Sequence, residues 1–333
     1  MFRSFRKCLT DMWIDVNRCE WMWIEGADMG KRVFMFPGQG SQYIGMGKEF
    51  YDNFQAAKDV YEMASEAARL DVAKLCFEAE SADRLNQTAY TQIAMLTTEA
   101  AILAVLKGQG IVADAAAGLS LGEYGAILAA EVMAPADVFA LIKKRGTYMQ
   151  EAVPVGGAMA AVLGLDGMTV KEVCEETFGE VFVANYNCPG QIVITGETGA
   201  VDRASAACKE AGAKRVIPLK VSGPFHSPLL QEAGKKLAKD LAKVAVRTPK
   251  IGYLSNVTAD YVTDLEKIRS LLALQVCHPV CWQQTIERLI ADGADEFVEI
   301  GPGKSLNGFM RKINRDVTSV SIDKLEDMKA YVG

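Results

Sequence analysis

The stretch "GLSLGEYG" at residues 118–125 decides how this chain folds around its chemistry. The small-residue run at 112–118 predicts a buried strand, and "LGEYGAILAA" from residue 121 predicts a helix. Ser120 therefore falls in a sharp turn between a strand and a helix, with glycines two residues away on either side. This is the context in which α/β enzymes present a serine nucleophile. We predict that Ser120 is such a nucleophile.

The α/β pattern extends on both sides of this turn. "RVFMF" at 32–36 predicts a strand that ends at "PGQGSQ", and the Ala-rich run at 91–110 predicts a helix ended by glycine. Near the C-terminus, 250–257 and 296–303 predict two more strands, with helices between and after them.

Between residues 153 and 221 the order of predicted strands and helices is different. The runs "GAMAAVLGL", "VFVANYNC", "QIVITG" and "RVIPLKV" predict strands, with helical stretches near 169–178 and 199–211, in the order β-α-β-β-α-β. We predict a small ferredoxin-like subdomain at 153–221, inserted into one large α/β subdomain formed by 30–152 and 222–333. The junction of the two is a natural cleft for a site.

Residues 1–29 look foreign to the rest. They hold three of the four Trp residues, but acidic residues interrupt them and they lack the continuous apolar segment of a signal peptide. Met29 then begins a segment, "MGKRVFMFPGQGSQ", that reads like the natural start of the protein. We predict an N-terminal extension that is not part of the fold; the alternative is a short amphipathic membrane anchor.

Composition excludes several classes of protein. The chain has 333 residues, of which 50% are hydrophobic and 23% charged, as in globular proteins. Its net charge of −6 argues against a nucleic-acid partner. Apolar runs are broken by glycine or charge, so we expect no membrane-spanning segment and a soluble, cytoplasmic protein.

The eight cysteines are scattered, with no C-x-x-C pair, which favours reduced thiols. One tight cluster, "CHPVC", places Cys277, His278 and Cys281 close together. Pro279 interrupts this run and no fourth ligand is evident, so we expect ordinary packing there rather than a metal site.

A serine hydroxyl needs a base within hydrogen-bond reach. The chain has two histidines, His226 and His278. His226 lies in "VSGPFHSPLL", where a glycine and two prolines favour a fixed loop, so we prefer it as the base. His278 is the alternative base, and a purely structural role is the alternative for either histidine.

The order and spacing of Ser120 and His226 do not match those of an α/β-hydrolase. In α/β-hydrolases the histidine follows an acidic residue and usually lies close to the C-terminus. Here 107 residues follow His226, a subdomain separates it from Ser120, and no HGGG-type motif precedes the turn.

Six segments, in their order and spacing, resemble the malonyl-CoA:acyl carrier protein transacylase family. They are "FPGQGSQ" (36–42), "GLSLGEY" (118–124), "KKRG" (143–146), "NYNCPGQIVITG" (185–196), "GPFHS" (223–227) and "VEIGPGKSL" (298–306). The resemblance runs from about Met29 to the C-terminal helix. It implies a large α/β-hydrolase-like acyltransferase domain with an inserted ferredoxin-like subdomain, and transfer of malonyl from coenzyme A to acyl carrier protein by a ping-pong route.

The resemblance also implies the catalytic residues. Ser120 would form the malonyl ester, and His226 would serve as acid and base in both halves of the reaction. The backbone N–H groups of Leu121 and Gln39 would stabilise the tetrahedral oxyanion.

Three further residues would bind the substrate. Arg145 would hold the malonyl carboxylate through two parallel hydrogen bonds, although "IKKRG" also fits a cationic last turn before a glycine cap. Asn187 would contact the substrate, and Phe225 would crowd an α-methyl group, which favours malonyl over methylmalonyl.

The sequence departs from the family pattern at two places. Leu119 replaces the histidine that commonly precedes the nucleophile, and "HPVCW" (278–282) replaces NPVQW. If a main-chain carbonyl of this loop orients the base, as the family implies, the second change is harmless. If a side chain is needed, the orienting group is unknown.

The implied partners are malonyl-CoA and acyl carrier protein. The phosphopantetheine is carried by the partner, so we expect no bound cofactor, and we expect a monomer. Because acyl carrier protein is acidic, docking needs a local basic rim. The candidates are Lys214, Arg215, Arg311 and Lys312, with the Lys-rich segment 234–250 as a further candidate that also fits a solvated helix face.

Two other functions fit the same residues. A free-standing acyltransferase of a polyketide synthase shares every motif and differs mainly in its partner. A catalytically silent scaffold that binds carrier protein is the third hypothesis, and the presence of Ser120, His226 and Arg145 speaks against it.

Overall fold

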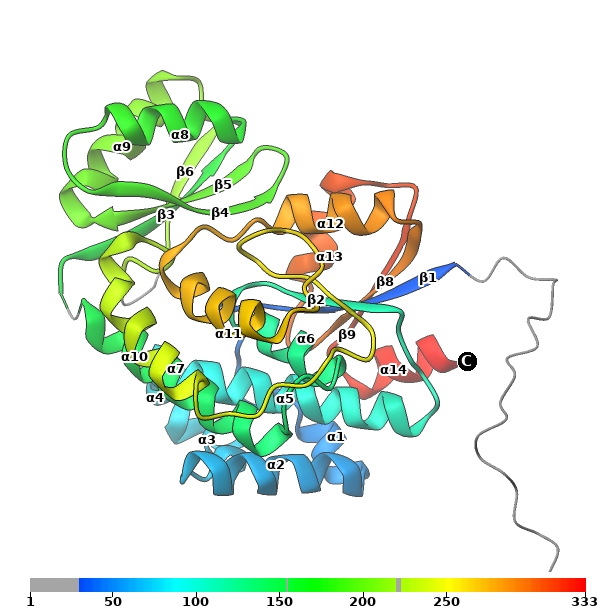
Figure 1. Ribbon diagram of the computed structural model, residues 1–333. Helices are drawn as coiled ribbons and strands as arrows, with labels where there is room; N and C mark the ends of the chain where they lie inside the picture. The colour runs from blue at the N-terminus through cyan, green and yellow to red at the C-terminus, as the bar shows by residue number, and fades with distance from the viewer. Residues whose placement is uncertain (1–29, 154, 220–222) are drawn as a thin grey trace, which may run out of the picture.

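Five parallel strands form the sheet that carries the turn at Ser120. The computed structural model describes residues 30–153, 155–219 and 223–333 (Figure 1), so the predicted extension at 1–29 lies outside the described residues. The strand order is β7-β2-β1-β8-β9. The bounds are β1 Lys31–Phe36, β2 Ala115–Gly118, β7 Gly252–Tyr253, β8 Ala294–Ile300 and β9 Thr318–Ile322.

The register of this sheet brings two sequence motifs together. Phe36 at the end of β1 lies opposite Gly118 at the end of β2. The "PGQGSQ" loop and the Ser120 turn therefore leave the sheet side by side, at the carboxyl ends of parallel strands. Ligands of open α/β sheets bind at this edge.

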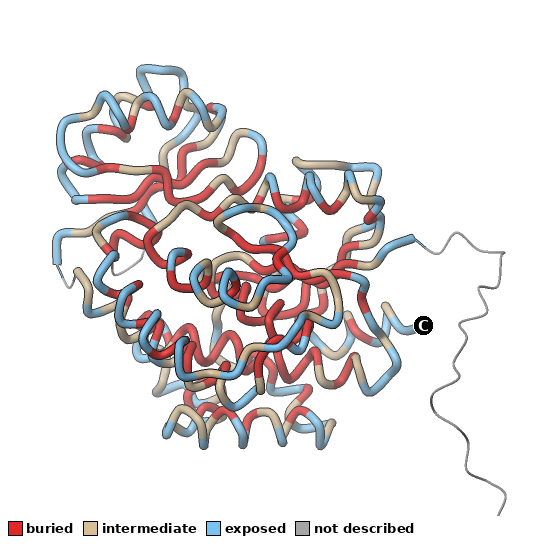
Figure 2. The backbone as a smooth tube through the Cα atoms, viewed as in Figure 1, coloured by how far each residue is buried: buried red, intermediate tan, exposed pale blue. Residues whose placement is uncertain are grey.

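Helices cover both faces of the sheet. On β1, Phe34 and Phe36 enter one core cluster, while Val33 and Met35 enter a second cluster with Trp282, because successive side chains of a strand point to opposite faces. Buried backbone accordingly runs through the centre of the molecule, and exposed segments lie outside it (Figure 2). The helices of this part are α1 Lys48–Asn53, α2 Gln55–Ala68, α3 Val72–Phe77, α4 Ala82–Leu85, α5 Thr88–Gly108, α6 Glu123–Ala129, α7 Pro135–Ala152, α10 Gln231–Leu241, α11 Leu265–Leu274, α12 Trp282–Ala291, α13 Ser305–Ile313 and α14 Leu325–Val332.

Helix α5 corrects the expectation that no segment could span a bilayer. Its 21 residues are long and apolar enough by length and composition, with a mean hydropathy of 1.4. However, 89% of that window is buried inside the protein, where α5 packs against α2 and α7. Its apolar composition is explained by its place at the centre of the core.

The second sheet is antiparallel, with the order β4-β5-β3-β6. Its strands are β3 Gly157–Leu163, β4 Val181–Cys188, β5 Gln191–Glu197 and β6 Arg215–Pro218. Helices α8 (Gly167–Glu176) and α9 (Thr198–Glu210) cover one face of it (Figure 1). This is the predicted β-α-β-β-α-β order, and the predicted α/β class with a ferredoxin-like insertion is confirmed.

The small sheet is tied to the large part through its edge strand. The Tyr186 N–H donates to the Val280 carbonyl at 2.9 Å, and the Val280 N–H donates to the Ala184 carbonyl at 2.8 Å. Because β4 is an edge strand, its free backbone groups can pair in this way with the loop before α12.

Several sequence expectations about local structure were wrong. The cationic last turn and glycine cap that "IKKRG" also fits are not formed, because helix α7 continues past Gly146 to Ala152. Gly146 is needed inside the helix because a Cβ there would lie 2.7 Å from the Thr88 carbonyl oxygen of α5. The predicted strand at 250–257 is only the two residues of β7, and β9 was not predicted because its side chains are mostly half-exposed.

We expect Glu99→Met to stabilise the fold at pH 7.5. Glu99 on α5 is fully buried, and neither carboxylate oxygen has a hydrogen-bond partner in the described structure. Burial, and then the nearby Glu299, raise its pKa well above the ordinary value. The folded protein therefore keeps the proton while the unfolded chain releases it, so stability falls as the pH rises above the unfolded pKa.

Urea unfolding at pH 7.5 and pH 4 measures this effect. Removing an unsatisfied buried polar group is worth about 1–3 kcal/mol, and the gain should shrink at pH 4. The same exchange at the exposed Glu62 is the control, expected to change neither value by more than about 0.5 kcal/mol. Loss of stability in Glu99→Met at pH 7.5 would contradict this account.

Candidate active site

The turn at Ser120 has a backbone conformation that two glycines make possible. Ser120 has φ 58°, in the left-handed region that L-residues seldom adopt. A Cβ on Gly118 would lie 1.9 Å from the carbonyl group of Gly122, and one on Gly122 would lie 2.1 Å from the Phe36 carbonyl oxygen. No side chain fits at either position, so the short 3₁₀ turn Ser120–Gly122 packs directly on the ends of β1 and β2.

Asn256 holds this turn from the far side of β2. Its Oδ1 accepts a hydrogen bond from the Ser120 N–H at 2.7 Å, and its Nδ2 donates to the Gly118 carbonyl at 2.6 Å. The two bonds hold the backbone on either side of Leu119, directly before the strained residue, and such support is how strain at a functional site persists.

The Ser120 hydroxyl is paired with His226. Ser120 Oγ lies 2.7 Å from His226 Nε2, and His226 Nδ1 lies 2.8 Å from the main-chain carbonyl oxygen of Gln275. A carbonyl can only accept, so Nδ1 carries the proton and Nε2 is free to accept from the serine hydroxyl. The group facing Nδ1 is thus a main-chain carbonyl, three residues before the altered "HPVCW" segment.

His278 lies in a different environment. Its Nδ1 is 3.0 Å from the Leu274 carbonyl oxygen and 3.5 Å from Cys277 Sγ. Cys281 Sγ instead points to the Val257 carbonyl, at 3.8 Å. Among the described residues no group of three or more His, Cys, Asp or Glu side chains is placed to hold a metal ion.

The environment of His226 keeps its ring neutral. The side chain is buried, and burial together with the positive charge of Arg145 lowers its pKa to about 4. A neutral imidazole at physiological pH is the form that can take a proton from a hydroxyl.

Arg145 brings a buried positive charge to the same place. Its side chain is fully buried in α7; Nη1 donates to Gln92 Oε1 at 2.6 Å, and Nη2 donates to Gln275 Oε1 at 2.8 Å and to Ser120 Oγ at 3.2 Å. Its Nε has no hydrogen-bond partner in the part of the chain that the structure describes. All three side-chain partners, two amides and one hydroxyl, are neutral, so they satisfy hydrogen bonds without neutralising the charge.

A cavity of about 230 Å³ opens beside Ser120, between the two sheets. Its lining includes six of the seven sequence-predicted site residues: Gln39, Ser120, Leu121, Asn187, Phe225 and His226. Arg145 lies just behind the lining, in contact with Ser120 and Gln92. Leu119, where the family commonly has histidine, is half-buried and also lines the cavity.

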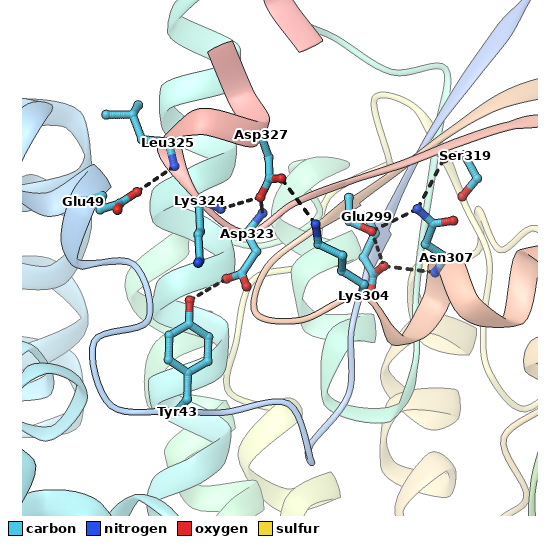
Figure 3. A network of polar contacts seen from close by, with 11 residues as sticks. Tyr43, Glu49, Glu299, Lys304, Asn307, Ser319, Asp323, Lys324, Leu325 and Asp327 are labelled. Atoms are coloured by element: carbon cyan, nitrogen blue, oxygen red, sulfur yellow. Dashed lines mark hydrogen bonds and ion pairs between the residues drawn. The ribbon is translucent and has the colours of Figure 1, made fainter. Parts of the chain in front are cut away.

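The loop that carries Gln39 is held at several points. Gly38 lets it approach the turn, since a Cβ there would lie 2.9 Å from the Leu119 carbonyl oxygen. Gln39 Nε2 donates to Thr88 Oγ1 at 3.1 Å. Further along, Tyr43 Oη donates to Asp323 Oδ1 at 2.9 Å (Figure 3).

The start of α13 forms another wall of the cavity. The Glu299 carboxylate, at the end of β8, accepts from the N–H groups of Leu306 and Asn307 at 2.9 and 3.0 Å (Figure 3). These bonds satisfy free donors of the helix N-terminus. They explain the acidic residue in "VEIGPGKSL", because it fixes the helix whose Leu306 and Phe309 line the cavity.

Residues 33–325 match the family described as the acyl transferase domain. The chain belongs to this family. A malonyl CoA-acyl carrier protein transacylase from Bacillus subtilis (strain 168) is 44% identical over 308 residues, which are 91% of this chain and 97% of that protein. These matches confirm the resemblance that the six sequence segments indicate.

Solved structures agree with this assignment. The malonyl CoA-acyl carrier protein transacylase of Clostridium perfringens is 43% identical and superposes with a TM-score of 0.87, covering 91% of this chain and 96% of that one. A malonyl-transacylase in complex with a type II polyketide synthase (PKS) acyl-carrier protein is 35% identical, with a TM-score of 0.88, and covers 91% of this chain and 99% of that one.

Four residues at the site of this acyltransferase were missed by the sequence analysis. They are the buried polar residues Gln92, Glu123, Asn256 and Gln275. Glu123 was inside the quoted "GLSLGEY" motif, and its acidic side chain next to a turn was an available signal. Gln92, Asn256 and Gln275 had no local signal, because their partners lie far away in the sequence.

We expect NMR to show His226 largely neutral down to about pH 5 in this acyltransferase, since its pKa is lowered to about 4. Arg145→Met removes a positive charge that disfavours the imidazolium, so the His226 pKa should rise towards its ordinary value. With two histidines in the chain, His278→Gln assigns the remaining imidazole signal to His226. A His226 pKa near 6.5 in the unsubstituted protein, or one that Arg145→Met leaves unchanged, would refute the electrostatic account.

Proposed function

We propose that this protein transfers the malonyl group of malonyl-CoA to the phosphopantetheine thiol of acyl carrier protein, through an ester on Ser120, and so supplies fatty acid biosynthesis. The observation that carries the proposal is the convergence of three groups at one small cavity. Ser120 Oγ lies 2.7 Å from the Nε2 of a neutral histidine and 3.2 Å from the Nη2 of a buried arginine.

The Ser–His pair serves both halves of the transfer. His226 Nε2 takes the proton as Ser120 Oγ attacks the thioester carbonyl, and the coenzyme A thiolate then leaves with that proton. In the second half His226 takes the proton of the incoming pantetheine thiol, whose sulfur attacks the ester. Ser120 regains its proton as the malonyl thioester departs. No other reactant is needed, so we propose that no cofactor is bound.

The oxyanion of each tetrahedral intermediate needs preorganised donors. We assign this role to the N–H groups of Leu121 and Gln39. Both residues line the cavity, and the register of β1 and β2 brings their loops together. Leu121 lies in the turn that leads into α6, where free amides favour an anion.

Arg145 is the proposed site for the malonyl carboxylate. In the malonyl ester that carboxylate is one methylene away from the carbonyl bonded to Ser120 Oγ, and Arg145 Nη2 already contacts Ser120 Oγ. Guanidinium groups bind carboxylates with two parallel hydrogen bonds, and the charge of Arg145 is not neutralised by its amide partners. Phe225 and Asn187 line the same cavity, where we propose that Phe225 limits substitution at the α-carbon and Asn187 contacts the acyl group.

The predicted basic residues lie at one end of the small sheet and on the neighbouring helix α13. Arg215 and Gln191 both lie opposite Leu163 in the small sheet, and Lys312 of α13 donates to Gln191 Oε1 at 3.1 Å. Lys214 and Arg311 adjoin these residues in sequence. None of the four basic residues forms an ion pair within the described ranges, so we propose that they attract the acidic carrier protein in the cytoplasm.

A polyketide carrier protein is the second candidate partner. A relative 35% identical to this chain was solved with a type II PKS acyl-carrier protein. The chemistry at Ser120 is the same for either partner. A silent scaffold remains the least supported function, because it gives no reason to bury the Ser120–His226 pair beside Arg145.

Intact-mass measurement after incubation with malonyl-CoA tests the function. We expect a malonyl adduct on the unsubstituted protein and none on Ser120→Ala, because no other residue replaces this nucleophile. Arg145→Met should lose roughly 2–5 kcal/mol of transition-state stabilisation for malonyl-CoA but keep acetyl-CoA loading. An adduct on Ser120→Ala, or equal losses for both thioesters in Arg145→Met, would contradict these roles.

Charge reversal tests the basic rim. Arg215→Glu with Lys312→Glu should raise KM for acyl carrier protein about fivefold to tenfold at low ionic strength, with less effect at high salt. Lys236→Glu with Lys239→Glu, on the exposed face of α10, is the control with the same change in charge. A rise in KM for this control alone would move the docking surface to α10.

A further inference from the structure

The side chain of Gln275 separates two buried charged residues. Its Oε1 accepts from Arg145 Nη2 at 2.8 Å, while its Nε2 donates to Glu123 Oε2 at 2.5 Å and to the Ser120 carbonyl at 2.8 Å. The main-chain carbonyl of the same residue faces His226 Nδ1. One residue thus connects the arginine, the base, the nucleophile and Glu123.

Glu123 is bound only by donors. It is fully buried in the first turn of α6. Its Oε1 accepts a short hydrogen bond from Tyr253 Oη, and its Oε2 accepts from the Asn256 N–H at 3.2 Å as well as from Gln275. Every one of these bonds can be made to an ionised carboxylate, which has acceptors and no donor.

Few charged or titratable groups surround this carboxylate. Arg145 on α7 is the charged group that acts on it, and Tyr253 on β7 and Tyr124 on α6 are titratable neighbours with strongly raised pKa values. Gln275 and Asn256, on the remaining sides, do not titrate. Burial raises the pKa of Glu123 to about 7, against the opposite effects of its hydrogen bonds and Arg145.

We propose that Glu123 is a positioning residue of the transfer reaction: its ionised carboxylate balances the buried charge of Arg145 across the amide of Gln275, and locks Gln275 so that its main-chain carbonyl orients His226. The proposal rests on the proposed function of this site.

The amide spacer explains how Arg145 is both stabilised and available. A direct Arg145–Glu123 ion pair would occupy the guanidinium and compete with the substrate carboxylate. With Gln275 between them, the anion acts over a longer distance and no acid occupies the guanidinium, whose Nε has no hydrogen-bond partner among the described residues. The same anion favours the imidazolium that forms at His226 in each transition state, which Arg145 alone disfavours.

Glu123→Gln removes the charge and keeps the shape. The glutamine oxygen can still accept from Asn256 and Gln275, and its amide can donate to Tyr253 Oη, which turns to accept. Tyr253→Phe is the matched variant, because it removes one hydrogen bond to the carboxylate and keeps the charge. The measurements are single-turnover acylation of Ser120 by malonyl-CoA at pH 6–8.5, steady-state kcat and KM, and Tm.

We expect acylation and kcat of Glu123→Gln to fall about 10- to 100-fold at pH 8, with KM for malonyl-CoA unchanged or lower, since an anion near the substrate carboxylate is gone. Tyr253→Phe should lose less than about fivefold. The unsubstituted protein should acylate more slowly as the pH falls through about 7, because protonation of Glu123 removes the anion, whereas Glu123→Gln should lack this step.

A rate within about threefold of the unsubstituted protein for folded Glu123→Gln overturns the proposal. So does a raised KM with unchanged kcat, or a pH step that persists in the variant. These outcomes are distinguishable from failure of the proposed function, in which the unsubstituted protein itself would take up no malonyl group on Ser120.

Discussion

Burying a guanidinium without neutralising it is the constraint around which this site is organised. Moving an ion out of water carries a penalty of several kcal/mol unless its hydrogen bonds are replaced. Here two glutamine side chains, Gln92 and Gln275, replace them, while burial, and then the positive charge of Arg145, lower the pKa of His226 to about 4. The position of the arginine therefore contributes to keeping the base neutral, fixes the Gln275 side chain beside it, and sets the charge offered to a substrate.

The sheet brings these groups together from distant parts of the sequence. Ser120 follows β2, and the Gln39 loop follows β1, so two adjacent parallel strands deliver both to one edge. Arg145 arrives from the middle of α7, held close to α5 by the absence of a side chain at Gly146. The small antiparallel sheet closes the cavity from the other side and contributes Asn187, and its pairing with Val280 ties it to the large part.

The local sequence pattern was enough to predict those features that depend on neighbouring residues in the chain. The strand-turn-helix around Ser120, the β-α-β-β-α-β order and the preference for His226 over His278 all came from composition, spacing and turn residues. Gly146 does not cap α7, although its sequence context fits a cap, because a glycine required by tertiary contact looks the same in sequence as a glycine that ends a helix. Asn256 and Gln275 could not be found, since each acts on residues more than a hundred positions away. Burial of Glu99 and Glu123 likewise follows from packing that no short window contains.

The group that faces His226 Nδ1 belongs to the backbone, and this has an evolutionary consequence. In a serine triad built from three side chains, a single codon change can delete the orienting acid. Here every amino acid placed at position 275 still supplies a carbonyl oxygen, so genetic drift in the neighbouring segment can proceed without removing the acceptor. The replacement of a family asparagine and glutamine by His278 and Cys281 is the kind of divergence that such an arrangement tolerates. For this one hydrogen bond, selection must preserve the path of the chain, which the side-chain contacts of Gln275 help to fix.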